Sequence, residues 1–562
     1  MNRIIKALKE RKFEIVFFLL WLAAAIVVTA FHEPWYDEAQ AWLIARDASF
    51  KTILFETTHT EGHPPLWQLL LSVFAKTGMP YEPSLKTLQL LITSAAVLLI
   101  LFKSPFPKLI RISLPFGFFI FYNTAVIARP YSITMLAFIL MAMTYNRRDE
   151  KPVPFVLSVS LLCLSHMFGI MMGGMICFVW VVKIIAENKK NKTLDRIYSD
   201  RRFLPLLLLF IFACLLIVDI APGNDQANAQ SAVSDLFTAD RVITSLKEFA
   251  LTIYQSTFSL FDSVDSVVIN VFMSAVIISA LIYYERKKDL KWEFFAPYLV
   301  FAVFHSIFWS FHYHSVFVVY LLIYFFWFSY TPEDHVFGDL IKKRLSMPLL
   351  RKLLAAVGVL LWISPIIASI GASVTEVRYH YQNFREMSAF IKEHDLSDKI
   401  IFENWTDSLK PQAVMSQEQS EDEKQAIEKQ QEIEERKQFD IKSAVVYELG
   451  LLPYFDHNIL ANVNVAQGDF SYAPHKNNPD NITELWHDIG VPDVLINVEN
   501  LEDIFSEDEL KDVNYALVYR NYYSIAWKLG SKGDGYDRIW VRRELLDECG
   551  LEEIPYDHNT VI

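Results

Sequence analysis

The chain has 562 residues, of which 53% are hydrophobic and 14% aromatic, and its formal net charge is −13. Soluble domains average about 45–50% apolar residues, so part of this chain is expected to face lipid. The acidic excess lies in residues 371–562, and an acidic region lacks the clustered cations that bind nucleic acid or anionic lipid. We therefore expect no nucleic-acid partner.

Long apolar runs fill residues 1–370. A helix needs about 20 apolar residues to cross a bilayer, with about 17 near the lower limit. The first run follows a basic start and has no small-residue cleavage site, so we interpret it as a retained membrane helix. We predict eleven transmembrane helices, at 13–31, 85–102, 110–127, 130–145, 153–167, 168–186, 203–220, 264–284, 294–311, 315–330 and 351–370.

The apolar segment 66–78 is shorter than these runs, and we predict that it lies at the membrane interface. If it does not cross, most lysines and arginines fall on one side, and that bias marks the cytoplasmic side. The chain is then a multi-pass cell-membrane protein with a cytoplasmic N-terminus. Outer loops are predicted at 32–84 and 221–262, and residues 371–562 are predicted to be extracytoplasmic.

The first outer loop opens on two adjacent carboxylates, Asp37 and Glu38, in HEPWYDEAQAWLIARD. A carboxylate at the membrane edge costs desolvation free energy unless it has a partner or a function. One function is that of a general base, which accepts the proton of an attacking hydroxyl. The alternative is that Asp37 caps a short helix at 38–47.

The same loop ends on HTEGHPPLWQLLL, where glycine and two prolines predict a turn before a helix. His63 would lie near that helix N-terminus, where backbone N–H groups favour phosphate. His59 and Glu61 are candidate substrate-binding residues. With His63 they could also ligate a metal, but neither a helix nor a turn fixes their spacing, so the identity of any metal stays unknown.

Arg129 lies between two predicted spans on the outer side, beside Pro130. An arginine at that depth is by default a functional candidate. Its guanidinium fork can bind two phosphate oxygens at once. The alternative is an ion pair with Asp37 or Glu38. The two roles are compatible, because the arginine can pair with a carboxylate while no phosphate is bound.

Three further histidines, His166, His312 and His314, occupy other outer junctions between predicted spans. Each histidine alone is typical of an interfacial residue that serves no chemistry. Together they lie on the same predicted side as Arg129 and the two carboxylates. We therefore include them as candidate substrate-binding residues.

These motifs resemble the GT-C glycosyltransferases, in particular glycosyltransferase family 39 and its protein O-mannosyltransferase and lipid A aminoarabinose transferase relatives. The resemblance rests on YDEAQAWLIARD, GHPPLWQLLL and ARPYSITMLAF, in that order, and covers roughly residues 1–190. It implies a polytopic α-helical membrane protein with an extracytoplasmic C-terminal domain. It also implies a donor in which a sugar is linked to polyprenyl phosphate, and an acceptor that is a glycan, a lipid or a protein.

The resemblance also implies roles for single residues. The aspartate matching Asp37 acts as the base or orients the acceptor, and the arginine matching Arg129 contacts the carrier phosphate. The residue matching His63 lies near that phosphate. Tyr131 follows the arginine and proline where many relatives have aspartate, which leaves the role of this position open. No cofactor is expected. Relatives of the oligosaccharyltransferase type need a divalent metal and a DxD-like pair, and no convincing pair is present here, which argues against a metal requirement but leaves it open.

Residues 371–562 have the pattern of an α/β domain, with strand-like segments that alternate with polar helical stretches. Residues 415–439 form a charged run that we interpret as a solvated helical insertion. A transporter or flippase for lipid-linked sugars is the alternative function. Against it, the predicted spans show no inverted repeat and almost no charge at mid-depth.

Overall fold

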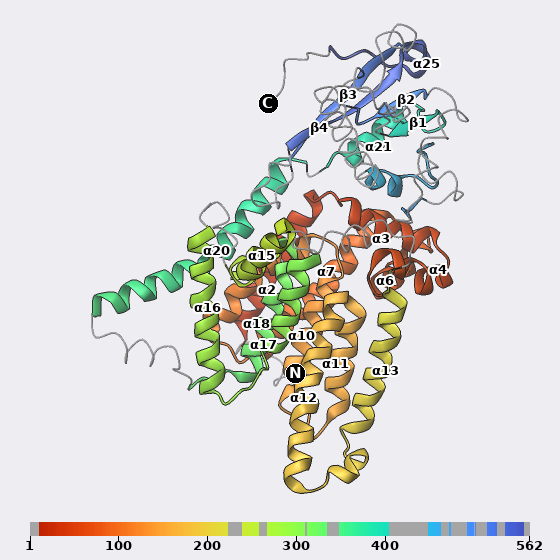
Figure 1. Cartoon of the computed structure of the whole chain (residues 1–562). Coiled ribbons are helices and arrows are strands. Elements are labelled where there is room, and N and C mark those ends of the chain that lie inside the picture. Colours follow the sequence, from red (N-terminus) through yellow and green to blue (C-terminus); the bar gives the residue numbers. More distant parts are fainter. Residues whose placement is uncertain are drawn as a thin grey trace, which may run out of the picture.

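The computed structural model describes residues 11–222, 239–257, 267–308, 312–333, 348–380, 382–403, 448–461, 471–473, 492–498, 501, 514–524 and 534–555. The predicted helical insertion at 415–439 lies outside these ranges. Within them the chain is mostly helical, with a small sheet near its C-terminus (Figure 1).

Five helices in the described ranges are long and apolar enough to cross a membrane. They are α2 (Lys12–Phe31), α7 (Tyr81–Lys103), α12 (Met167–Asn191), α13 (Phe203–Ile220) and α16 (Val267–Lys287). Membrane-helix character therefore agrees with the sequence analysis. The count of eleven spans stays a prediction.

The span predicted at 110–127 is not one straight helix. It is a helix pair, Lys108–Phe116 and Phe118–Val126, bent by 57°. Its parts are α8 (Lys108–Ser113), η1 (Leu114–Phe116), α9 (Phe118–Phe121) and the π-helical η2 (Tyr122–Val126). The break has a local cause, because Pro115 has no amide hydrogen and Gly117 is extended, with ψ of 148°. As one span, the pair would make a sixth membrane helix.

Five shorter apolar helices correspond to other predicted segments. These are α6 (Leu66–Ala75), α10 (Tyr131–Tyr145), α11 (Pro152–Ser165), α17 (Phe295–Phe308) and α18 (Val316–Ser329). At about 1.5 Å per residue, α10 is roughly 22 Å long, shorter than a hydrocarbon core of about 30 Å. Eleven of its 15 residues are buried, since α10 packs against α7, α11 and α18.

The second predicted outer loop, 221–262, contains a helix. In its described part, α15 (Ala239–Thr257) packs against α16, α17 and α18, and it buries Leu251, Ile253 and Tyr254. The composition boundary near residue 370 also falls within a helix, because α20 (Pro348–Arg378) continues to Arg378. The change in composition near residue 370 therefore does not mark the end of this helix. It marks a change from an apolar to a more polar part of the same helix.

The C-terminal region is built on a four-stranded sheet in the order β1-β2-β4-β3. The strands are β1 (Ile401–Glu403), β2 (Val494–Ile496), β3 (Tyr515–Ser524) and β4 (Asp534–Arg542). β1 and β2 are parallel, and the other two pairings are antiparallel. All four strands lie in the region for which the sequence predicts alternating strand-like segments. Leu460 adds an isolated parallel bridge to Ile401 of β1.

This region packs on the first outer loop. Phe384, Met387 and Ile391 of α21 (Phe384–Glu393) share a hydrophobic core with the sheet and with Leu43 and Ile44 of the loop. Figure 1 shows the sheet region next to α3, α4 and α6, at the end of the bundle away from the α12–α13 hairpin.

Candidate active site

Asp37 lies in the first turn of α3 (Tyr36–Asp47), two residues after the N-cap Trp35. The helix begins earlier than the predicted 38–47, and the carboxylate that accepts the Trp35 amide hydrogen, at 3.1 Å, belongs to Glu38. The prediction that Asp37 is the helix cap is therefore wrong. The Asp37 carboxylate forms an ion pair with Arg129 instead, and 23% of its side chain stays exposed.

Glu38 points the other way and is fully buried. One of its oxygens accepts the Ala128 amide hydrogen at 2.6 Å. The other accepts the Trp35 amide and lies 3.0 Å from His32 Nε2. Because Glu38 contacts both the start of α3 and the residue before Arg129, it fixes the two segments that carry the ion pair.

Arg129 lies in the break between η2 and α10, and only 12% of its side chain is exposed. Its guanidinium carbon is 5.8 Å from the centroid of the Tyr131 ring. Burial alone would lower the pKa of Arg129, but the Asp37 carboxylate raises it above its ordinary value. The guanidinium therefore stays charged, and its predicted ion-pair partner is present.

His63 follows Gly62, which has a φ of +63° and ends α5 (Thr57–Glu61) in a left-handed conformation. The His63 ring centroid lies 4.1 Å from that of His166. Burial, and then the charge of Arg129, lower the pKa of His63 to about 3. His63 is therefore neutral at pH 7, and it can donate one hydrogen bond to an anion without carrying charge.

His166 is the N-cap of α12, where its Nδ1 accepts the Phe168 amide hydrogen at 3.2 Å. The proton must then be on Nε2 in the neutral ring. This buried nitrogen has no hydrogen-bond partner within the ranges that the structure describes. The ring of His314 lies 6.0 Å from that of His166, and the ring of His305 a further 5.9 Å from His314.

The other predicted residues lie apart from this group. His59 Nδ1 is 2.7 Å from the Ala221 carbonyl oxygen, and Glu61 accepts a hydrogen bond from Gln40 at 3.0 Å. Neither joins His63 in a metal-ligand group among the described residues. His312 belongs to η4 (His312–Ser315), and its side chain lies outside the described part.

A buried network behind the site was not predicted. His32 lies between Glu38 and Glu376, with its Nδ1 2.9 Å from the Glu376 carboxylate, and Tyr122 donates to the other Glu376 oxygen. Burial would lower the pKa of His32, but the two carboxylates raise it to about 10. The sequence did contain one indication of this network. His32 directly follows an apolar run, and polar residues at the membrane edge usually have partners.

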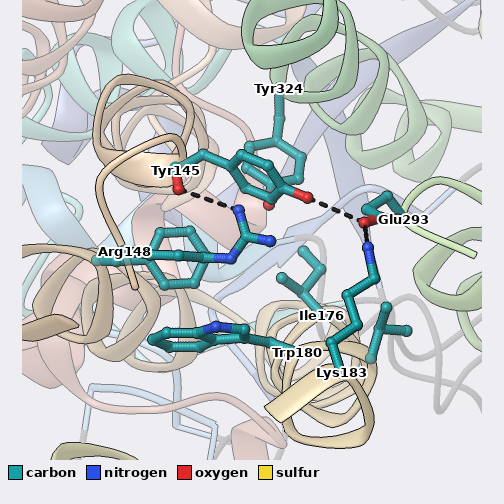
Figure 2. Close-up of a pocket in the computed structure, with 9 residues that line it drawn as sticks. Tyr145, Arg148, Ile176, Trp180, Lys183, Glu293 and Tyr324 are labelled. Atoms are coloured by element: carbon teal, nitrogen blue, oxygen red, sulfur yellow. Dashed lines mark hydrogen bonds and ion pairs between the residues drawn. The ribbon is translucent and has the colours of Figure 1, made fainter. Parts of the chain in front are cut away.

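A cavity lined by Tyr145, Arg148, Trp180, Lys183 and Glu293 is separate from this site (Figure 2). Its empty volume is about 270 Å³, part of which is open to solvent. Arg148 donates to the Tyr145 carbonyl at 3.0 Å, and Lys183 pairs with Glu293. Because α10 starts beside Arg129 and ends at Tyr145, the cavity lies roughly 20 Å from the ion pair.

Comparisons with protein-family models, with curated proteins and with solved structures found no match. The functional argument therefore depends on the Asp37–Arg129 ion pair and its neighbours. These are a charged guanidinium, a partly exposed carboxylate and neutral imidazoles, held together at one end of a bundle of apolar helices.

Proposed function

We propose that the chain is a multi-pass membrane glycosyltransferase that moves a sugar from a polyprenyl-phosphate carrier to an extracytoplasmic glycan, lipid or protein. The observation that carries the proposal is the Asp37–Arg129 ion pair beside the neutral His63. An anion receptor and a proton acceptor in contact are what displacement of a phosphate leaving group requires. The resemblance to GT-C enzymes supports the same reaction.

In this reaction an acceptor hydroxyl attacks the anomeric carbon of the donor sugar. A bond forms between the acceptor oxygen and that carbon, and Asp37 takes the hydroxyl proton. The bond from the carbon to the phosphate oxygen breaks, and the carrier phosphate leaves with its electron pair. Arg129 stabilises the charge that develops on the phosphate, and His63 donates a hydrogen bond to it.

The ion pair gives the two residues an order of action. While Arg129 is paired with Asp37, the guanidinium contacts the carboxylate oxygen that would otherwise be open to an acceptor hydroxyl. A donor phosphate competes for the same guanidinium and frees Asp37 as it binds. The base would therefore become active only after the donor is in place.

The connectivity of the helices supports a site on the outer face. α7, α10 and α12 each have one end near the site. Lysines and arginines gather at their other ends, within 103–111, 146–151 and 188–192. Lysine and arginine favour the cytoplasmic side. Under this orientation the donor sugar and the acceptor meet on the extracytoplasmic side.

The test compares two variants of the purified chain. Arg129→Ala should weaken binding of a polyprenyl-phosphate sugar about 10–150-fold, because a hydrogen bond to a charged group contributes about 1.5–3 kcal/mol. Asp37→Asn should keep donor binding but slow release of the carrier phosphate about 10²–10⁴-fold, measured with a cell-envelope extract as acceptor source. Asp195→Asn, whose carboxylate is 75% exposed in η3 (Leu194–Ser199), is the matched control.

Two outcomes would contradict the proposal. If Glu38→Gln stops transfer in a folded protein while Asp37→Asn does not, the two carboxylates have been assigned the wrong way round. If the chain moves the intact donor across a bilayer without breaking the sugar–phosphate bond, it is a flippase.

A further inference from the structure

Three metal-binding side chains meet where the segment between α2 and α3 faces the link between α20 and α21. Glu33 comes from the first segment, His380 from the link, and Glu386 from the first turn of α21. One ligand atom from each residue lies within 4.8 Å of the other two. Within this group, His380 Nδ1 is 3.5 Å from a Glu386 oxygen.

Glu33 is the unusual member, because only 1% of the residue is exposed. One of its oxygens accepts the Arg385 amide hydrogen. Its other oxygen is buried and has no donor within the described ranges, and the same holds for Oε2 of Glu386. A buried carboxylate oxygen without a donor loses the free energy of hydration and regains none.

The guanidinium of Arg385 does not donate to the second Glu33 oxygen. The Arg385 guanidinium contacts Glu82 at 2.8 and 2.6 Å. Glu33 and Glu386 each keep one buried carboxylate oxygen without a donor among the described residues, and ligand atoms of the two residues lie within 4.8 Å of each other. The two carboxylates therefore need a positive charge between them, which a proton or a metal cation can supply.

We propose that Glu33, His380 and Glu386 bind one divalent metal ion of the zinc class and fasten the C-terminal region to the loop that carries Asp37. An imidazole and two carboxylates suit zinc, whereas calcium and magnesium prefer oxygen ligands alone. Ligand atoms around tetrahedral zinc lie about 3.3 Å apart, from bonds of about 2.0–2.2 Å. Small side-chain rotations of His380 and Glu386, both partly exposed, bring the three atoms to that spacing.

The site is separate from the proposed reaction, because Glu33 points toward the C-terminal region and Asp37 toward Arg129. Metal binding here requires no sugar transfer. A failure of one proposal therefore leaves the other standing.

The test uses the full-length protein in detergent after chelator treatment, titrated with zinc chloride by calorimetry. We expect one equivalent of zinc to bind the unsubstituted protein and to raise its Tm, with magnesium much weaker. Glu33→Gln and His380→Ala should each weaken zinc binding at least about tenfold and abolish the rise in Tm. His380 is 48% exposed, so His380→Ala keeps the test valid if Glu33→Gln fails to fold.

The control is His457→Ala, which removes an exposed histidine paired with Asp456 at 2.7 Å in the same region. It should leave the zinc affinity unchanged. The proposal is overturned if the unsubstituted protein binds no zinc, or if His457→Ala weakens binding as much as His380→Ala does.

Discussion

His32 shows how one side chain can connect distant segments. Glu38 faces it from α3 and Glu376 from α20, Tyr122 of η2 bonds to Glu376, and Lys86 of α7 donates to the His32 carbonyl. An imidazolium between two buried carboxylates is attracted to both, although its single charge balances only one of them. Removing one member of such a group typically costs about 3–5 kcal/mol of stability.

This arrangement predicts a pH dependence of stability. The pKa of His32 is about 10 in the folded protein and about 6.5 when unfolded, so its contribution is complete below about pH 6.5 and is lost as the pH rises to 10. We expect the Tm to fall over this range, and His32→Gln to have a lower Tm at neutral pH and a flatter profile. Thermal melts at stepped pH measure this, with His457→Gln as control. Parallel profiles for His32→Gln and the unsubstituted protein would contradict it.

At this scale the sequence predicted Asp37 and Arg129, because a charge in an apolar setting stands out without any structural knowledge. The residues alone left both Asp37 and Glu38 as candidates, and only the resemblance to GT-C enzymes favoured Asp37. Both are carboxylates in one turn, and their directions depend on donors from Ala128 and His32. Nor could it predict Glu376, which meets His32 across 344 positions of sequence.

At the scale of the elements, α11 and α12 approach each other closely at Gly169. A Cβ atom there would lie 2.2 Å from the Leu162 carbonyl oxygen, whereas one at Gly174 of the same helix would meet nothing within 4 Å. Small residues of this kind let membrane helices pack backbone to backbone. The contact also sets where α12 begins, and therefore where its N-cap His166 lies.

We predict that Gly169→Ala destabilises the protein by about 1–3 kcal/mol, because the helices must move apart. Gly174→Ala should be neutral or stabilising by up to about 1 kcal/mol, since alanine favours a helix. Denaturation of the two variants side by side gives the comparison. Equal stability of the pair would show that the helices are not in contact at Gly169.

Apolar runs predicted where most helices lie, because the bilayer demands the same length and composition of every span. They did not predict the bend at Gly117 or the helix α15, since both depend on neighbours. The sheet was predictable from alternating strands. The packing of the sheet region against Leu43 and Ile44 could not be predicted. The sequence pattern of a short helix in a loop does not show whether solvent or another domain covers it.

At the scale of the whole molecule, the proposed orientation makes a prediction about access. A cysteine at Asp456, a position whose side chain is 96% exposed, should react with a membrane-impermeant thiol reagent in intact cells. One at Asn191, exposed at the end of α12, should react only after the cells are permeabilised. Labelling of Asn191→Cys alone in intact cells would place the Asp37–Arg129 pair on the cytoplasmic side.

The length of chain between His32 and Glu376 also has a consequence for synthesis. A ribosome adds roughly 5–20 residues per second, so the 344 positions between them correspond to about 17–70 s. During that interval His32 and Glu38 are already in place while their third member does not yet exist. The His32–Glu38–Glu376 network can therefore assemble only after α20 has been made, so a nascent chain that stalls earlier lacks this support behind the Asp37–Arg129 pair.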